Sequence, residues 1–179
     1  MAKRTTDRKR ASRGSDRLYE LEVFITSGPM TEAFAKANRV VSRTILIRGS
    51  QTLAKLHEAI FDAFNREDEH MYEFQIGGKG PMDPKARRYV LPMAADDPFA
   101  DERPAGVVTR TKLDDLGLRK DQPFAYWFDF GDDWWHQIDV VSIRDDAPTG
   151  RYPKVTAKTG ESPPQYIDWD EEGQEGDEE

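Results

Sequence analysis

The sequence predicts an α+β fold, in which a mostly antiparallel sheet of about five or six strands packs against one main amphipathic helix. Three observations support this prediction. Segments with alternating or β-branched residues outnumber helical ones. Only one segment, which begins near residue 50, keeps apolar residues at helical spacing over several turns. Residues 124–143 hold two aromatic strands joined by a short Gly-Asp turn, which is the pattern of a β-hairpin.

Two expected strands precede the main helix. Residues 18–26 alternate between apolar and polar side chains, as a half-buried strand does. Residues 39–48 are rich in β-branched side chains, which favour strands. Between them, residues 31–38 allow one or two helical turns, with Thr31 as the cap.

The main helix is expected to start at Ser50 or Thr52, since either residue is a good N-cap, and to fray after Asn65. Charged residues such as Lys55 and Glu58 occupy the side that faces solvent. The apolar side consists of Leu53, Leu56, Ile60, Phe61 and Phe64.

The second half of the chain adds further strands. Residues 70–76 form a third expected strand, with aromatic side chains in alternation. Residues 81–106 are rich in Pro, Asp and Ala and are expected to be irregular, apart from a short strand at 88–91. A helical turn is expected near residues 113–118. After the hairpin, the Pro and Gly residues of the segment 144–160 predict an extended loop.

The two ends of the chain differ in charge from the middle. Residues 1–17 hold seven basic and two acidic residues, whereas residues 161–179 hold nine acidic residues and no Lys or Arg. Segments this charged bury too little apolar surface to order by themselves, so we expect a basic and an acidic disordered tail. Residues 18–160 are expected to form a single domain.

The composition excludes several classes of protein. The chain has no Cys, which excludes disulfides, thiolate zinc sites and Cys nucleophiles. No segment approaches the roughly 20 apolar residues of a membrane span, and no apolar run follows the basic N-terminus as in a secretory signal. We therefore expect a cytoplasmic protein without a membrane partner. Nucleophile-elbow, Walker-loop and dinucleotide motifs are also absent from the sequence.

The hairpin is the densest group of candidate functional residues, because it holds three of the four Trp residues. A two-residue turn at Gly131-Asp132 would pair Asp129 with Trp134 and Trp127 with His136. Side chains alternate along a strand, so one face would then carry Trp127, Asp129, Trp134 and His136. The other face would carry Phe124, Tyr126, Phe128 and Trp135.

Aromatic density without a recognisable catalytic set favours a non-enzymatic binding module with an unidentified protein partner. The acidic residues of the turn also suit turn chemistry, since Asp side chains accept hydrogen bonds from nearby backbone amides. Arg43 is a candidate partner for Asp129. The expected binding residues are Arg43, Tyr72, Trp127, Asp129, Asp132, Asp133, Trp134 and His136.

A metal-dependent hydrolase is an alternative. Imidazole and carboxylate ligands suit a divalent ion such as zinc or manganese. The candidate ligands are His57, His70, His136 and Asp129. Their spacing matches no metal motif, so no cofactor is expected. A general-base pair without metal, formed by His136 with Asp129 or Asp133, is a further alternative.

Three motifs carry a family resemblance: TLxxLH at residues 52–57, HxYxF at residues 70–74 and FxYxxDFGDDWxH at residues 124–136. Together they resemble the plasmid pRiA4b ORF-three family, also called TnpR-like passenger proteins of insertion sequences. The chain departs from the family pattern at Ser42, where members often carry Trp, and in having no Cys in its closing segment. The resemblance implies a small α+β domain of no established activity and an association with mobile elements.

That association makes a nucleic-acid-associated accessory protein the other alternative. Residues 1–17 would contact phosphate backbones without sequence specificity. Exposed Trp127 or Trp135 would stack on single-stranded bases. The net negative charge of residues 18–160 and of the acidic tail opposes this interpretation.

Overall fold

The structure is a computed structural model that describes residues 16–168. In chain order the elements are β1 (Leu18–Ser27), α1 (Glu32–Ala37), β2 (Ser42–Arg48), α2 (Leu53–Ala63), β3 (Tyr72–Ile76), β4 (Arg87–Val90), α3 (Pro92–Ala95), β5 (Gly106–Val107), the 3-10 turn η1 (Leu113–Leu116), β6 (Pro123–Phe128), β7 (Trp134–Arg144) and β8 (Lys154–Thr159).

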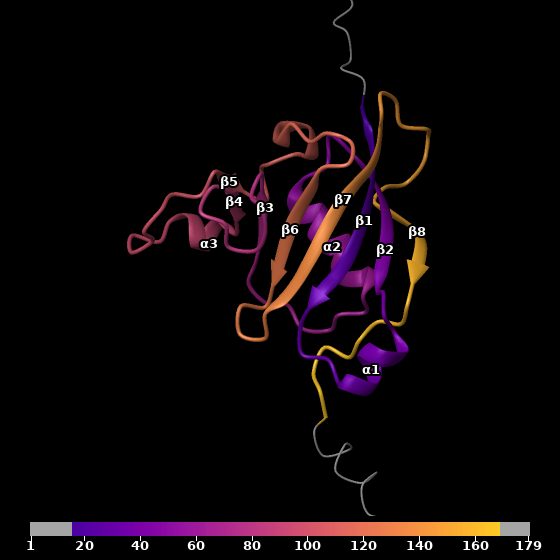
Figure 1. Cartoon of the computed structure of the whole chain (residues 1–179). Helices are drawn as coiled ribbons and strands as arrows, with labels where there is room; N and C mark the ends of the chain where they lie inside the picture. Colours follow the sequence, from indigo (N-terminus) through magenta and orange to yellow (C-terminus); the bar gives the residue numbers. More distant parts are fainter. Residues whose placement is uncertain (1–15, 169–179) are drawn as a thin grey trace, which may run out of the picture.

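All the strands join one sheet in the order β5-β4-β3-β6-β7-β1-β2-β8 (Figure 1). Every pair of neighbours is antiparallel except β4 and β5, which are parallel. The predicted α+β class is therefore confirmed. The predicted strand number is wrong, because the sheet has eight strands and not five or six.

The main helix α2 forms where its apolar spacing predicts. Its N-cap is Thr52, whose side-chain oxygen accepts a hydrogen bond from the Lys55 amide at 3.3 Å. Leu53, Leu56 and Ile60 are buried on the side that faces the sheet. The two short helices α1 and α3 bury no residue completely. The core therefore lies between α2 and one face of the sheet (Figure 1).

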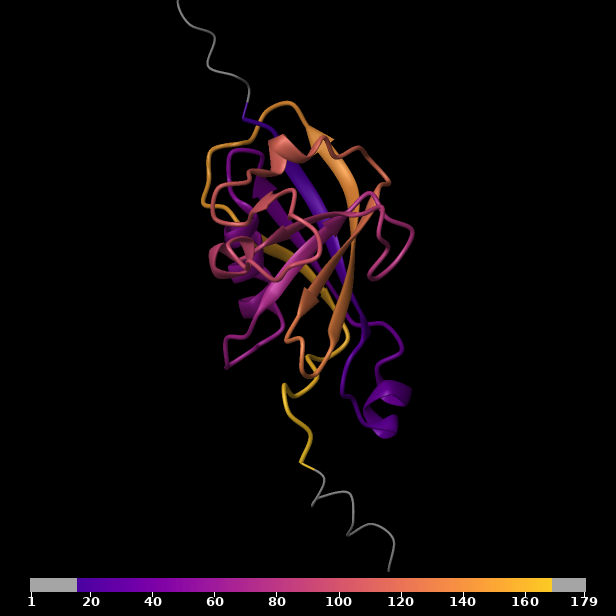
Figure 2. The ribbon, with the colours of Figure 1, turned by 90° about the vertical axis from the view of Figure 1, so that its left-hand side faces the viewer.

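The opposite face of the central strands is covered by none of the described helices. In Figure 2, α2 lies on one side of the sheet and the strands β7 and β1 border the other side. We call this uncovered surface the open face. Its outward side chains are Ala125 and Trp127 from β6, Trp135, Gln137 and Asp139 from β7, and Glu20, Glu22 and Phe24 from β1.

Residues 154–159 correct the prediction of a loop after the hairpin. They form β8 and pair with β2, so that β2 is not the edge of the sheet. Val155 packs against the core and gives the strand its one apolar anchor. The short strand expected at residues 88–91 is confirmed as β4.

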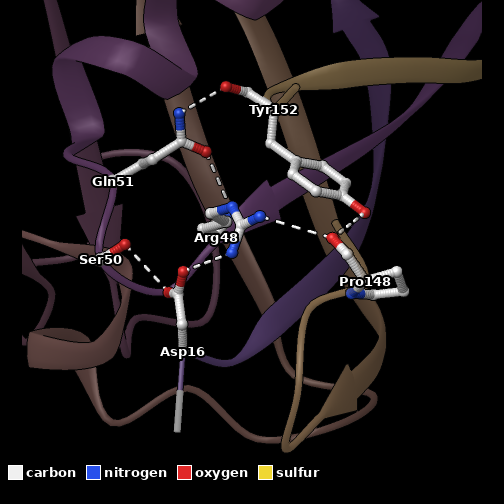
Figure 3. Close-up of polar contacts among 6 residues, drawn as sticks. All are labelled: Asp16, Arg48, Ser50, Gln51, Pro148 and Tyr152. Atoms are coloured by element: carbon white, nitrogen blue, oxygen red, sulfur yellow. Dashed lines mark hydrogen bonds and ion pairs between the residues drawn. The ribbon is translucent and has the colours of Figure 1, made fainter. Parts of the chain in front are cut away.

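Asp16, just before β1, is held by polar contacts. Its carboxylate accepts hydrogen bonds from Arg48 at 2.6 Å and from Ser50 at 2.9 Å (Figure 3). Gln51 then donates to the carbonyl of Tyr152 at 2.7 Å. These contacts tie the start of β1, the residues before α2 and the β7–β8 connection together at one corner.

The expected tails are only partly described. Residues 1–15 and 169–179 lie outside the described residues. Residues 161–168, which were expected to belong to the acidic tail, instead pack against the end of α2. The Gln165 side chain is buried there and accepts from the Glu67 amide at 2.8 Å. Within residues 16–168, no helix has the length and apolar character needed to span a bilayer.

Candidate binding face

The β6–β7 hairpin has a longer loop than the sequence predicts. The last pair of the ladder is Phe128 with Trp134, so residues 129–133 form the loop. Asp129 and Asp133 take positive φ angles of 57° and 55°, which Asp tolerates better than most residues. Asp129 also accepts from the amide of Gly131 at 3.1 Å. The expected two-residue turn at Gly131-Asp132 is therefore wrong.

The longer loop moves the pairing by one residue and turns β7 over relative to β6. Trp127 pairs with Trp135 and Tyr126 pairs with His136. Trp134 and His136 consequently point into the core, where they are 0% and 2% exposed. The expected face of Trp127, Asp129, Trp134 and His136 is not formed.

The same shift creates an aromatic surface on the open face. The indole rings of Trp127 and Trp135 stack with their centroids 4.8 Å apart and their planes at 7°. Phe130, from the loop, stacks on Trp127 at 4.1 Å and is 37% exposed. Both Trp side chains are partly exposed. We call Trp127, Phe130 and Trp135 the aromatic platform.

A hydrogen bond fixes one edge of the platform. The indole N–H of Trp127 donates to the Asp133 carboxylate at 2.9 Å. The bond satisfies the only donor of the indole, and the two faces of the ring are covered by Trp135 and Phe130. The platform is therefore held in one orientation by the hairpin itself.

A cleft of about 380 Å³ adjoins the platform. Thr26, Ala125 and Gln137 of the open face contribute to its lining, and residues 78–81 of the β3–β4 connection form a wall. In Figure 2 this connection (magenta) stands beside the sheet on the side away from α2. Gln75 holds it there, because its side-chain oxygen accepts from the Met82 amide at 2.9 Å. The volume lies within the range of small-ligand pockets.

Three carboxylates lie on the open face beyond the cleft. Glu22 and Asp139 stand directly opposite each other on β1 and β7, and Glu20 follows along β1. Each accepts a hydrogen bond from a neutral Ser or Gln side chain, at distances of 2.8 to 3.0 Å. Among residues 16–168, no Lys, Arg or His forms an ion pair with any of the three.

His57 lies on the other side of the sheet, in the core. Its ring stacks on Tyr72 with centroids 3.7 Å apart. Its two ring nitrogens contact the Tyr126 hydroxyl at 2.7 Å and the Glu69 carboxylate at 2.9 Å. Burial lowers the pKa of His57, against the opposing effect of Glu69. The pKa values of Tyr72 and Tyr126 are raised by burial. Tyr72 is therefore a packing partner of His57, away from the open face.

The histidine that pairs with Asp129 is His70, whereas the sequence suggested His136 as its partner. The imidazole Nε2 lies 3.4 Å from the Asp129 carboxylate and 2.9 Å from the Tyr166 hydroxyl. His136 instead contacts the carbonyl oxygen of Tyr126 at 3.3 Å inside the core. The expected pairs of His136 with Asp129 or Asp133 are not formed.

The four candidate metal ligands are not gathered in one place. His57 binds Glu69, His70 binds Asp129 and His136 faces the core. Within the described part of the chain, no group of three or more His, Cys, Asp or Glu side chains has the arrangement that a metal ion needs.

Arg66 is a buried cation that the sequence did not single out. Its guanidinium carbon lies 3.7 Å from the centroid of the Trp134 ring, and its side chain is 7% exposed. Among the described residues no acceptor contacts its terminal nitrogens. Burial lowers the pKa of Arg66 to about 10. Burial, helped by the nearby Arg66 charge, lowers the pKa of His136 to about 3.

Arg43 has a structural position and not the expected place beside Asp129. It is 2% exposed, and its Nε donates to the carbonyl oxygen of Ala63 at the end of α2, at 2.9 Å. Its terminal nitrogens donate to the Gly160 carbonyl at 3.2 Å and to the Ser162 hydroxyl at 2.8 Å. Burial lowers its pKa. Arg43 therefore joins α2, β2 and the C-terminal segment.

The sequence also gave no weight to Phe130 or to the open-face carboxylates as binding residues. Alternation along residues 18–26 does point Glu20 and Glu22 away from the core. Their position beside Asp139 depends on the pairing of β1 with β7, which lie far apart in the sequence. The sequence therefore predicts in which direction each of these carboxylates points. It does not predict that they lie next to one another.

Comparison with known protein families shows the family of the chain. The family model described as plasmid pRiA4b ORF-3-like protein matches residues 33–171. The chain belongs to this family. The match covers the hairpin with its platform and the cleft residues other than Thr26. It begins after β1, which supplies Thr26, Glu20 and Glu22.

Two similar proteins have no stated function. The uncharacterized protein y4hQ of Sinorhizobium fredii is 27% identical over 139 residues, which are 72% of this chain and 59% of that protein. The chain thus spans less than two thirds of that relative. Among solved structures, a protein of unknown function from Methanosarcina mazei, MM3350, is similar with a TM-score of 0.59 and 24% identity over 80% of this chain and 70% of the other. This likeness concerns the fold alone.

Proposed function

We propose that this pRiA4b ORF-3-like domain is a non-enzymatic binding module that holds a polypeptide segment of a partner protein on the aromatic platform. The observation that carries the proposal is the stacking of Trp127 on Trp135 on a sheet face that none of the described helices covers. The hydrophobic core lies on the other face and does not include these two rings.

The chemistry of the platform suits a protein ligand. Trp side chains are enriched among the residues that dominate binding energy at protein interfaces, because they offer a large, rigid surface. The neighbouring cleft of about 380 Å³ gives one side chain of a bound segment a place to insert. The row of stacked rings beside the cleft would give an extended segment contacts at several successive positions.

The charge of the open face disfavours a nucleic acid. Affinity for DNA and RNA depends on Lys and Arg side chains that neutralise phosphates. On this face Asp133, Asp139 and Glu22 form no ion pair with any Lys, Arg or His of the described residues. Of the two cations nearby, Arg88 is paired with Glu73 and Lys79 lines the cleft. Trp127 also has no free face on which a base could stack, because Trp135 and Phe130 cover both sides of its ring.

The positions of the His residues also favour binding over catalysis. His57 is buried in the core behind the sheet, and His136, although it contributes to the lining of the cleft, is 2% exposed. His70 pairs with Asp129 beside the C-terminal segment. Hydrolysis of a ligand bound at the platform would require a general base there, and the carboxylate in contact with the platform, Asp133, already accepts the indole N–H of Trp127.

A random peptide library displayed on phage and selected against the full chain tests the proposal. Enriched peptides are expected to lose at least about tenfold in affinity for the Trp127→Ala/Trp135→Ala variant, since hot-spot Trp residues contribute more than about 1.4 kcal/mol each. The matched control is Phe99→Ala, which removes an aromatic side chain that is 90% exposed elsewhere on the surface. Failure to enrich any peptide, or enriched peptides that bind the double variant as tightly as the wild type, would overturn the proposal.

A further inference from the structure

The open face carries negative charge that the described residues do not neutralise. Glu22 and Asp139 face each other directly across β1 and β7. Like charges in this position destabilise a sheet. Neutral Ser42 and Gln137 side chains orient these two carboxylates and leave their charge in place. The two charges are thus held side by side on an accessible surface.

One of these carboxylates, Asp139, lies on the same strand as Trp135 of the platform. Trp135, Gln137 and Asp139 are successive outward residues of β7. Four residues of an extended strand span about 13 Å. The cleft, which Gln137 helps to line, lies between the two ends of this row. An extended segment laid along β7 would therefore meet the platform, then the cleft, then the carboxylates.

Resting on the proposed function, we infer that the bound segment is basic and extended, with two cationic side chains four residues apart. One Arg or Lys covers the outer face of the Trp135 ring, the face turned away from Trp127, in a cation–π contact. The other reaches between Glu22 and Asp139. Arg is the better residue at both positions, because its planar guanidinium stacks on aromatic rings and binds carboxylates through two parallel hydrogen bonds.

The chemistry at both ends of the row supports this choice of ligand. Asp133 accepts from the Trp127 indole and so places a carboxylate at the edge of the platform. A cation at the platform thus meets the outer face of Trp135 and has a negative charge at the same platform. Glu20 extends the acidic region past Glu22. A neutral or acidic segment would leave these carboxylates without compensation.

Fluorescence anisotropy with synthetic peptides and the full chain tests the inference. The labelled probe is an extended, Ser- and Pro-containing peptide with two Arg residues four positions apart. Matched peptides carry Gln or Glu in place of both Arg, or place the two Arg next to each other. The Arg peptide is expected to bind at least about tenfold more tightly than the Gln peptide, and its affinity is expected to fall with added salt.

Two charge variants locate the effect. Glu20→Gln/Glu22→Gln/Asp139→Asn is expected to reduce the affinity for the Arg peptide about tenfold and to leave that for the Gln peptide unchanged. The control Asp96→Asn/Asp101→Asn/Glu102→Gln removes the same formal charge from exposed residues outside the open face. It is expected to leave the affinities for the Arg peptide and the Gln peptide unchanged.

The outcomes separate this inference from the proposed function. Display-selected peptides that depend on Trp127 and Trp135, together with no preference for Arg over Gln, would overturn the inference and leave the proposed function standing. Arg-peptide binding that the control variant weakens as much as the open-face variant would also overturn it, because a general charge effect would then suffice. Selected peptides indifferent to both Trp residues would overturn the proposed function and the inference together.

Discussion

Trp127 and Trp135 stand directly opposite each other in the β6–β7 ladder, and their indole rings lie 7° from parallel with centroids 4.8 Å apart. Their neighbour in sequence, Trp134, points the other way and is 0% exposed. The hairpin therefore separates its Trp residues into two that are accessible to a partner and one that belongs to the core.

This separation predicts different stabilities for two Ala variants. Trp127→Ala removes a partly exposed ring and one stacking contact, so we expect its free energy of unfolding to fall by about 1 to 2 kcal/mol. Trp134→Ala opens a cavity in the core, and we expect a loss of about 3 to 5 kcal/mol. Urea denaturation of both variants measures the difference. Equal losses would mean that Trp127 serves the fold as much as Trp134 does.

The buried His136 predicts a loss of stability in acid. Burial lowers its pKa to about 3 from the ordinary 6.5, so the folded protein keeps the ring neutral. Below pH 6.5 the unfolded chain binds a proton that the folded protein does not. The free energy of unfolding therefore falls as the pH drops from 6.5 towards 3, by at most about 1.4 kcal/mol per pH unit from this residue.

His136→Gln removes this titration. Urea denaturation at pH 7 and pH 5 is expected to show a smaller loss for the variant than for the wild type. His57, whose pKa burial also lowers, is present in both proteins and contributes equally. The same loss in both proteins would show that His136 is not kept neutral by the fold.

Tyr126→Phe tests the hydrogen bond between its hydroxyl and His57. Glu69 occupies Nε2 of the imidazole, so Nε2 donates and Nδ1 accepts from the Tyr126 hydroxyl. Removing the hydroxyl leaves a buried acceptor unpaired, and we expect a loss of about 1 to 3 kcal/mol in the free energy of unfolding. Tyr152→Phe is the control, since its hydroxyl makes an exposed bond to the Pro148 carbonyl. A control that loses as much as Tyr126→Phe would contradict this assignment.

Arg43→Lys is expected to release the C-terminal segment. A Lys ammonium cannot reach the carbonyl oxygen of Ala63, the carbonyl of Gly160 and the hydroxyl of Ser162 together, as the guanidinium does. Hydrogen exchange is expected to become faster in residues 160–168 and to stay unchanged in β1 and β6. Unchanged exchange in residues 160–168 would show that Arg43 does not hold the segment.

Most of the fold was predictable because its signals are local. The helix α2 follows from apolar residues at helical spacing, and Thr52 caps it as the sequence indicates. The strand β8 was missed because the Pro and Gly residues around it predict a loop. It forms because it pairs with β2 and inserts Val155 into the core. That pairing joins segments more than 100 residues apart.

The candidate site was predictable in composition and not in geometry. The aromatic hairpin was evident, yet the expected Gly-Asp turn placed Trp134 and His136 beside Trp127. The loop is longer because Asp129 and Asp133 adopt positive φ angles, which a turn centred on Gly131 does not need. A shift of one residue in the pairing then exchanges the side chains of β7 between the two faces. The length of the loop determines the register of the hairpin, and the local sequence does not predict that length.

The most direct test of the binding face is the NMR shift of the indole N–H signals during titration with a display-selected peptide. The account predicts that the signals of Trp127 and Trp135 move with saturation while that of the buried Trp134 stays in place. Assignment through single Trp→Phe variants identifies each signal. A shift confined to Trp134, or no shift of Trp127 and Trp135 while the peptide binds, would contradict the proposal that the aromatic platform is the binding surface.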